Sequence, residues 1–240
     1  MMRRSLAIIM ALLTTSALLA ADGGQQEIKT VLFPFRDTVV SARVEAVLKN
    51  YKFLQGQAFK AGDTLVELDN SRYAIELART TEQLRFAQST YEEKKELREK
   101  KFTSDAELRK AEYDLRLTEI ACEEAKLNVS YCTVKAPFDG KIVEIMTHDF
   151  ETTRSGQTLC RIIDDNQLLA VMNVPLTDRA LTTIGTTVKI RLDQKEATAT
   201  GTIYEVSPQA DHRTGTVRIR VLIDNRQGLF FAGMTGTLQK

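Results

Sequence analysis

Residues 71–129, SRYAIELARTTEQLRFAQSTYEEKKELREKKFTSDAELRKAEYDLRLTEIACEEAKLNV, carry the longest helical pattern in the chain. Apolar and small residues recur there at spacings of three and four, which places them on one face of a helix. Ser104 and Glu107 have the spacing of a capping box, which marks the start of a second helix. We therefore predict two antiparallel helices with a tip at residues 103–105. At 1.5 Å per residue the hairpin extends roughly 40 Å.

The two helices are expected to meet along coiled-coil seams. The predicted seam of the first helix, which is expected to run to about Lys101, consists of Ala74, Leu77, Thr81, Leu84, Gln88, Tyr91 and Lys95. The predicted seam of the second helix consists of Leu108, Ala111, Leu115, Thr118, Cys122, Ala125 and Val129. Dense charges of alternating sign between residues 92 and 110 indicate solvated helix faces. A small domain cannot cover a hairpin of this length, so we expect the hairpin to contact another molecule.

The segments on either side of the hairpin resemble each other when the sequence is shifted by 94 positions, so that Ala42 superimposes on Ala136. Both segments contain short apolar runs with a glycine-led turn before the last run, a pattern typical of short strands. Internal similarity of this kind indicates two copies of one structural unit. We predict a single small β-domain whose first half is residues 37–70 and whose second half is residues 130–166.

Residues 167–240 are predicted to form a second β-domain, because several short apolar strands separated by turns are typical of a small barrel. A short helix is expected between Pro175 and Thr183, since proline favours the first turn of a helix. The strand from Glu27 is expected to end at Pro34, which has no N–H for a strand ladder, and residues 22–36 are assigned to the barrel. The predicted fold class is mainly β with a long α-helical coiled-coil hairpin.

The N-terminus has the pattern of a targeting segment. Arg3 and Arg4 precede an apolar run over residues 6–21 that is short for a membrane span and typical of a secretory signal peptide. We assign residues 1–21 to a signal peptide, with an uncleaved N-terminal anchor as the alternative. The chain is therefore expected to be exported by this segment.

Composition argues against several other functions. The chain has 33 basic and 32 acidic residues and no Trp, so it lacks the clustered basic charge expected of a nucleic-acid-binding protein. Cys122, Cys132 and Cys160 have no metal-ligand spacing and lie in apolar patterns, which predicts buried free thiols, with a Cys132–Cys160 bridge as an alternative. The two histidines are isolated from each other in turn-like stretches, and no hydrolase or phosphate-binding motif is present. We predict no catalytic, cofactor-binding or metal-binding residues.

Several motifs occur in an order that resembles one known family. They are Gly56, Gly62-Asp63, Leu65 and Asp69, then Ala136-Pro137-Phe138-Asp139-Gly140, Ser155-Gly156, Gly185, Pro208, Arg213-Thr214 and Gly233-Met234. Over residues 30–240 the chain resembles the periplasmic adaptors, or membrane fusion proteins, of bacterial tripartite efflux and secretion systems. The resemblance implies that the split domain has a lipoyl-like sandwich fold and that the last domain is a β-barrel.

The same resemblance implies a non-catalytic function in transport. The barrel would face an inner-membrane transporter, with the resistance–nodulation–division (RND) type favoured and an ATP-driven or type I secretion system as the alternative. The hairpin tip would meet an outer-membrane channel protein. The adaptor would lie in the periplasm, peripheral to the inner membrane. It would act as a homo-oligomer, a hexamer in the assembly, without cofactor or nucleic acid.

The predicted partner-binding residues lie at the hairpin tip and are Leu97, Lys101, Ser104 and Leu108. Many family members carry at the tip an Arg, a Leu four residues on and a Ser seven residues after that. Leu97 and Ser104 match this pattern, while Glu93 occupies the arginine position. The alternative is structural, with Leu97 packing inside the hairpin and Ser104 acting as a helix cap. The chain also has Ala46 and Phe150 where the repeat expects glycine.

A lipoyl or biotinyl carrier domain is the alternative from a different functional class. Such a domain needs a lysine at an exposed turn between the two halves of the fold. In this sequence the helical insertion replaces that turn, and Arg72 is the nearest basic residue. A guanidinium group cannot accept the acyl group in that way, which disfavours this alternative.

Overall fold

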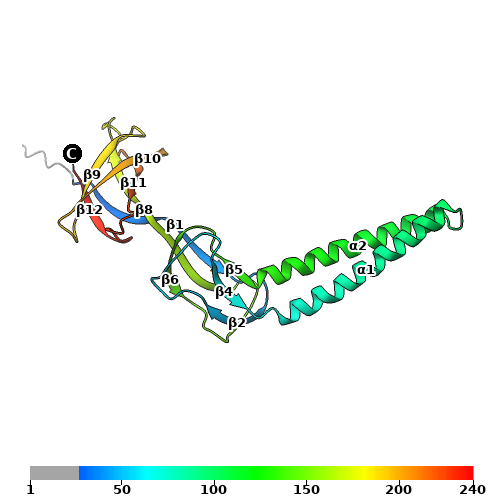
Figure 1. Cartoon of the computed structure of the whole chain (residues 1–240). Helices are drawn as coiled ribbons and strands as arrows, with labels where there is room; N and C mark the ends of the chain where they lie inside the picture. The colour runs from blue at the N-terminus through cyan, green and yellow to red at the C-terminus, as the bar shows by residue number, and fades with distance from the viewer. Residues whose placement is uncertain (1–26, 240) are drawn as a thin grey trace, which may run out of the picture.

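The computed structural model describes residues 27–239, and the predicted signal peptide lies outside them. The elements follow the chain as β1 (Lys29–Ser41), β2 (Ala46–Tyr51), β3 (Ala58–Phe59), β4 (Thr64–Leu68), α1 (Ser71–Glu99), α2 (Asp105–Tyr131), β5 (Thr133–Lys135), β6 (Gly140–Ile145), β7 (Thr152–Thr153), β8 (Thr158–Pro175), β9 (Thr187–Leu192), β10 (Thr198–Asp211), β11 (Thr216–Asp224) and β12 (Thr235–Gln239). Figure 1 shows a barrel at one end, a sandwich in the middle and the α1–α2 hairpin projecting alone.

Reciprocal backbone hydrogen bonds join the two halves of the sandwich. The Gly62 N–H donates to the Ala136 carbonyl at 2.8 Å, and the Gly156 N–H donates to the Ala42 carbonyl at the same distance. The two donors, Gly62 and Gly156, are 94 positions apart, and so are the two acceptors, Ala42 and Ala136. The first half donates in one bond and accepts in the other. The pairing of β2 with β7 and of β3 with β6 is related in the same way. Each half therefore completes the strand ladder of the other, as two-fold pseudo-symmetry requires.

The sandwich has one core to which both halves contribute. Ala42 and Leu48 from the first half lie in the same buried cluster as Ala136, Ile142 and Leu159 from the second. Neither half has enough apolar surface to form this core alone, so the two fold together although the hairpin separates them in sequence. The prediction of one β-domain built from two distant segments is confirmed.

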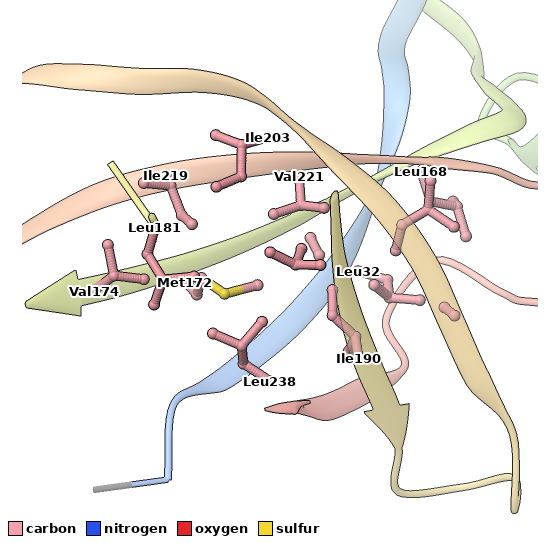
Figure 2. Packing of buried hydrophobic residues seen from close by; sticks show 14 of the residues in the cluster. Leu32, Leu168, Met172, Val174, Leu181, Ile190, Ile203, Ile219, Val221 and Leu238 are labelled. Atoms are coloured by element: carbon pink, nitrogen blue, oxygen red, sulfur yellow. The ribbon is translucent and has the colours of Figure 1, made fainter. Parts of the chain in front are cut away.

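The second domain is a closed barrel of six strands. The sheet order β1-β12-β9-β10-β11-β8 is completed by direct pairing of β1 with β8, which leaves no open edge in the barrel. Alternate residues of its strands point inward, and Figure 2 shows Leu32, Met172, Ile190, Ile219 and Leu238 converging on one core. The predicted barrel, with the N-terminal strand as a member, is present.

Two long strands connect the barrel to the sandwich, which differs from the expected boundaries. β1 does not end at Pro34 but continues to Ser41, because Pro34 lies where the β1–β8 register shifts and its missing N–H interrupts no regular ladder. Likewise, the strands predicted at 159–163 and 168–174 are one strand of 18 residues, β8. Its polar middle remains in the ladder, where Asp164 pairs with Arg36 and Gln167 pairs with Asp224.

The helix predicted after Pro175 is not formed. Residues 176–186 make successive hydrogen-bonded turns, such as the bond from the Asp178 N–H to the Pro175 carbonyl at 3.1 Å. Thr182 and Thr183 donate their hydroxyls to the Arg179 carbonyl. Side-chain bonds of this kind compete with helical backbone bonds and favour isolated turns.

The hairpin seam is confirmed in α2 and shifted in α1. All seven predicted seam residues of α2 are buried or half-buried. In α1, four of the predicted residues are exposed, while Thr80 is buried and Ala87 is half-buried; the exposed ones are Ala74, Thr81, Gln88 and Lys95. Thr80 can occupy the seam because its hydroxyl donates to the Glu76 carbonyl at 3.0 Å, which satisfies its polar group inside the hairpin.

Phe150 tests the equivalence of the two halves, because its backbone has the positive φ that glycine normally adopts. Its φ is +67°, and the equivalent residue of the first half, Gly56, has a φ of +84°. The left-handed region costs a residue with a Cβ about 1 kcal/mol. Phe150 is 83% exposed, so its ring contributes little burial. We expect Phe150→Gly to raise the free energy of unfolding by about 0.5–1 kcal/mol, measured by denaturant unfolding.

The matched variant in the other half is Gly56→Ala. An added Cβ at Gly56 would meet no atom within 4 Å, so this variant tests the backbone conformation alone. We expect it to lower the free energy of unfolding by about 1 kcal/mol. If both variants shifted stability in the same direction, the assignment of strain to Phe150 would be wrong.

Candidate functional site: the hairpin tip

The tip begins where α1 ends in a Schellman motif. The Phe102 N–H donates to the Leu97 carbonyl at 2.8 Å, and the Lys101 N–H donates to the Arg98 carbonyl at 3.0 Å. These bonds satisfy two of the carbonyls that the end of a helix leaves free. The motif needs a left-handed residue, and Lys101 supplies it with a φ of +60°. The helix consequently ends at Glu99, two residues before the predicted end.

The second helix begins with the predicted capping box. The Ser104 hydroxyl accepts from the Glu107 N–H at 3.2 Å, and the Glu107 carboxylate accepts from the Ser104 N–H at 3.4 Å. Thr103 also donates to the Glu107 carboxylate. Arg98 of α1 pairs with Asp105 of α2 and ties the two helices together. The tip is therefore an ordered turn with its helix ends capped.

The ion pair at the tip shifts the pKa values of both of its side chains, Arg98 and Asp105. The hydrogen bond from Arg98 holds the pKa of Asp105 below its ordinary value of 3.8. Folding lowers the pKa of Asp105, so the ion pair contributes fully to stability at pH values above the pKa of this carboxyl in the unfolded chain. The contribution is lost as the pH falls through the lower pKa of the folded state. The Asp105 side chain is 62% exposed and that of Arg98 is 37% exposed, so solvent screens the pair and its contribution is small at neutral pH.

The four predicted partner-binding residues occupy two different environments. Leu97 and Leu108 are half-buried at the end of the helix seam, whereas Lys101 and Ser104 are exposed at the turn. Leu97 and Ser104 thus have the structural roles considered for them, packing and capping. Glu93, at the position of the family arginine, is exposed on α1.

The most exposed apolar residue of the tip is not among the residues predicted from the sequence. Phe102 lies in the turn that connects α1 to α2, and its side chain is 78% exposed. A large aromatic side chain on a projecting turn has no partner within its own hairpin, a feature of protein contact sites. The signal in the sequence was the aromatic residue between the end of one helix and the cap of the next.

Comparison with known families identifies the chain. The family profile described as "RND MFP, barrel-sandwich hybrid domain" matches residues 36–165. The profile described as "CusB-like, beta-barrel domain" matches residues 167–240. The first match alone covers more than half of the chain. This protein belongs to the RND membrane fusion protein family.

Individual relatives agree with this assignment. The nodulation protein NolF of Rhizobium meliloti is 26% identical over 220 residues, which cover 85% of this chain and 59% of NolF. The multidrug resistance protein MdtA of Photorhabdus laumondii is 24% identical over 215 residues, which cover 80% of this chain and 54% of MdtA. The chain thus spans little more than half the length of these curated relatives.

A solved structure shows the same fold. A MacA–MexA chimera containing the Pseudomonas aeruginosa MexA α-hairpin domain superimposes with a TM-score of 0.76 at 18% identity. The match covers 89% of this chain and 78% of the chimera. The predicted fold class, a split lipoyl-like sandwich with a coiled-coil hairpin and a small barrel, is confirmed.

The hairpin of this membrane fusion protein is attached to the sandwich at its base. The Tyr73 hydroxyl at the start of α1 donates to the Glu45 carbonyl at 2.9 Å. The Arg43 guanidinium lies 5.1 Å from the centre of the Tyr131 ring at the end of α2. The two helix ends are therefore held to neighbouring parts of the first half of the sandwich.

The cysteines of this membrane fusion protein are buried and free, as predicted. Burial raises the pKa of the Cys160 thiol to about 11 and also raises the pKa of Cys132, which makes both thiols unreactive at neutral pH. Within residues 27–239 no group of three or more potential metal ligands occurs. No helix in the same range combines the length and apolar character needed to cross a membrane.

Removing the cap should loosen the tip. We expect Ser104→Ala to reduce the stability of the first turn of α2 by about 1 kcal/mol, because the Glu107 N–H loses its acceptor. Hydrogen exchange of the Glu107 amide measures the effect. Ser104→Asp restores an acceptor and should keep protection close to that of the unaltered chain. Equal loss of protection in both variants would contradict the capping role.

Proposed function

We propose that this protein is a periplasmic adaptor subunit that links an inner-membrane transporter, of the RND type, to an outer-membrane channel protein in a tripartite efflux pump. It carries out no chemistry of its own. The observation that supports the proposal most strongly is the projecting hairpin on a chain of the RND membrane fusion protein family. The hairpin is too long to be covered by its own sandwich, and it ends in an ordered, capped tip.

The two ends of the molecule suit two different partners. The tip presents Phe102, Lys101 and Ser104 to solvent, with Leu97 and Leu108 supporting the turn from behind. We assign this end to the channel. The barrel, at the opposite end of the molecule (Figure 1), is assigned to the transporter.

Export and self-assembly complete the proposal. The basic and apolar N-terminal segment supports export to the periplasm. Several copies, six in the full assembly, would surround the transporter with their barrels and reach the channel with their hairpins. Each contact can be weak, because assembly raises the effective concentration of the remaining contacts.

Co-purification tests the function. The full chain, isolated from cross-linked envelopes of its own host, is expected to bring down an inner-membrane transporter and an outer-membrane channel, identified by mass spectrometry. Ser104→Arg should reduce channel recovery about tenfold, the effect of losing one contact of about 1.4 kcal/mol, and leave transporter recovery unchanged. Recovery of neither protein would refute the adaptor function.

The control for Ser104→Arg is Ser104→Ala. Both variants lose the helix cap, but only arginine adds bulk and charge to the proposed contact. Channel recovery that falls equally in the two variants would assign the defect to loss of the cap. Unchanged channel recovery in Ser104→Arg would contradict the assignment of the tip to the channel.

A further inference from the structure

An open pocket of about 680 Å³ lies on the outside of the barrel, beside the turn that joins β10 to β11. All but one of the described residues that line it have polar side chains. Arg213 and Arg218 bring two positive charges, and Asp211 is the one acidic residue among the described residues of the lining. Because Thr216 of β11 pairs with Pro175, the last residue of β8, the pocket lies toward the end of the barrel away from the sandwich.

The pocket is hollowed by a bulge in β10. A register shift in the pairing of β10 with β11 leaves residues 207–209 opposite Arg218 alone. The Ser207 hydroxyl closes this bulge, since it donates to the Gln209 carbonyl at 3.1 Å and accepts from the Gln209 N–H at 3.2 Å. A bulge bends its strand and redirects the side chains, and bulges are common beside functional sites. The concave wall opposite Arg218 is therefore part of the strand geometry.

Asp211 orders the turn that carries Arg213. Its carboxylate accepts from the Arg213 N–H at 2.9 Å, and its backbone carbonyl accepts from the Gly215 N–H at 2.9 Å. The Gly215 carbonyl accepts from the Leu176 N–H at 3.1 Å, which ties the turn to the residue that follows β8. The acidic group of the pocket thus bonds the backbone of the turn and holds the base of the Arg213 side chain in place.

Both guanidinium groups of the pocket are available to a ligand. Within residues 27–239, neither the Arg213 nor the Arg218 guanidinium makes an ion pair or a hydrogen bond. Arg220, two residues further along β11 on the same face, is by contrast paired with Glu205 at 3.0 Å. Asn173 is the residue that pairs with Arg218 on β8, so its exposed amide stands beside that guanidinium.

We propose that this pocket binds a phosphate group, as a monoester or a diester, between Arg213 and Arg218. A guanidinium presents a planar fork of N–H donors that matches two phosphate oxygens. The Asn173 amide and the His212 ring, which also line the pocket, can each donate a further hydrogen bond. The inference goes beyond the proposed function, because it assigns a ligand to the barrel and does not depend on a transporter or a channel.

The number of donors favours phosphate over a carboxylate. One guanidinium fork already engages both oxygens of a carboxylate. A phosphate group has further oxygens, which the second arginine and the Asn173 amide can bond. The pocket is within the size range of small-ligand sites, so there is room for the ester substituent. The same phosphate group occurs in phospholipid headgroups and in soluble phosphate esters.

Two binding measurements on the purified full chain test the site and distinguish these sources. One is calorimetry with glycerol phosphate, and the other is co-flotation with vesicles of phosphatidylglycerol and phosphatidylcholine in equal parts. Arg213→Gln and Arg218→Gln should each weaken binding roughly tenfold or more, because each removes charge-assisted hydrogen bonds. Arg191→Gln is the matched control: Arg191 is exposed on β9 outside the pocket, and its replacement removes the same charge. It should change binding no more than about twofold, since salt screens a distant surface charge.

The two measurements separate the possible outcomes. Binding of glycerol phosphate that is lost in both pocket variants supports the site and assigns it to soluble esters. Binding to the vesicles alone, with the same dependence on the variants, supports the site and assigns it to a lipid headgroup. Absence of binding in both measurements would overturn the inference. Binding that all three variants weaken equally, or that none of them changes, would also overturn it, because the overall charge or another site would then hold the anion. Thermal unfolding of each variant verifies that these exposed substitutions leave the fold intact.

Discussion

The structure depends on the hydrogen bonds that the two halves of the sandwich exchange. Gly62 donates to Ala136 and Gly156 to Ala42, each at 2.8 Å. Loss of either half would leave these backbone groups without partners and expose the core they surround. β4 also pairs with β5, and the Leu68 N–H donates to the Cys132 carbonyl at 2.8 Å. Because this pairing places the end of β4 beside the start of β5, a long insertion can leave and re-enter the domain at one point. The hairpin can therefore project without disturbing the fold that holds it.

The same constraint explains how the barrel is connected. Having paired within the sandwich, β1 and β8 continue together into the barrel, where they close its ring. Ion pairs flank this passage, with Asp37 bound by Arg161 and Asp165 bound by Lys141. Asn225 of the barrel adds a hydrogen bond to the Asp165 carbonyl at 2.8 Å. The barrel and the sandwich are thus joined by two continuous strands, and the sandwich holds the base of the hairpin.

The sequence predicted features that depend on local patterns or on the repeat. The capping box at Ser104, the α2 seam and the joining of two distant halves follow from spacing alone. The α1 seam was misplaced because the burial of Thr80 depends on a hydroxyl bond that periodicity does not reveal. The continuity of β8 was missed since Asp164 and Gln167 resemble a linker until their partners, Arg36 and Asp224, are known. Phe102 was missed because exposure at a tip is a property of the assembled turn.

The most direct test of the central claim is excision of the hairpin. Residues 72–129 are replaced by a short glycine-rich loop, and hydrogen exchange of the Gly62 and Gly156 amides is measured. If the two halves form one body that needs nothing from the hairpin, both amides remain protected and exchange together in one cooperative unfolding event. Rapid exchange at both positions, with loss of cooperative unfolding, would show that the hairpin is part of the folded domain and would contradict the account.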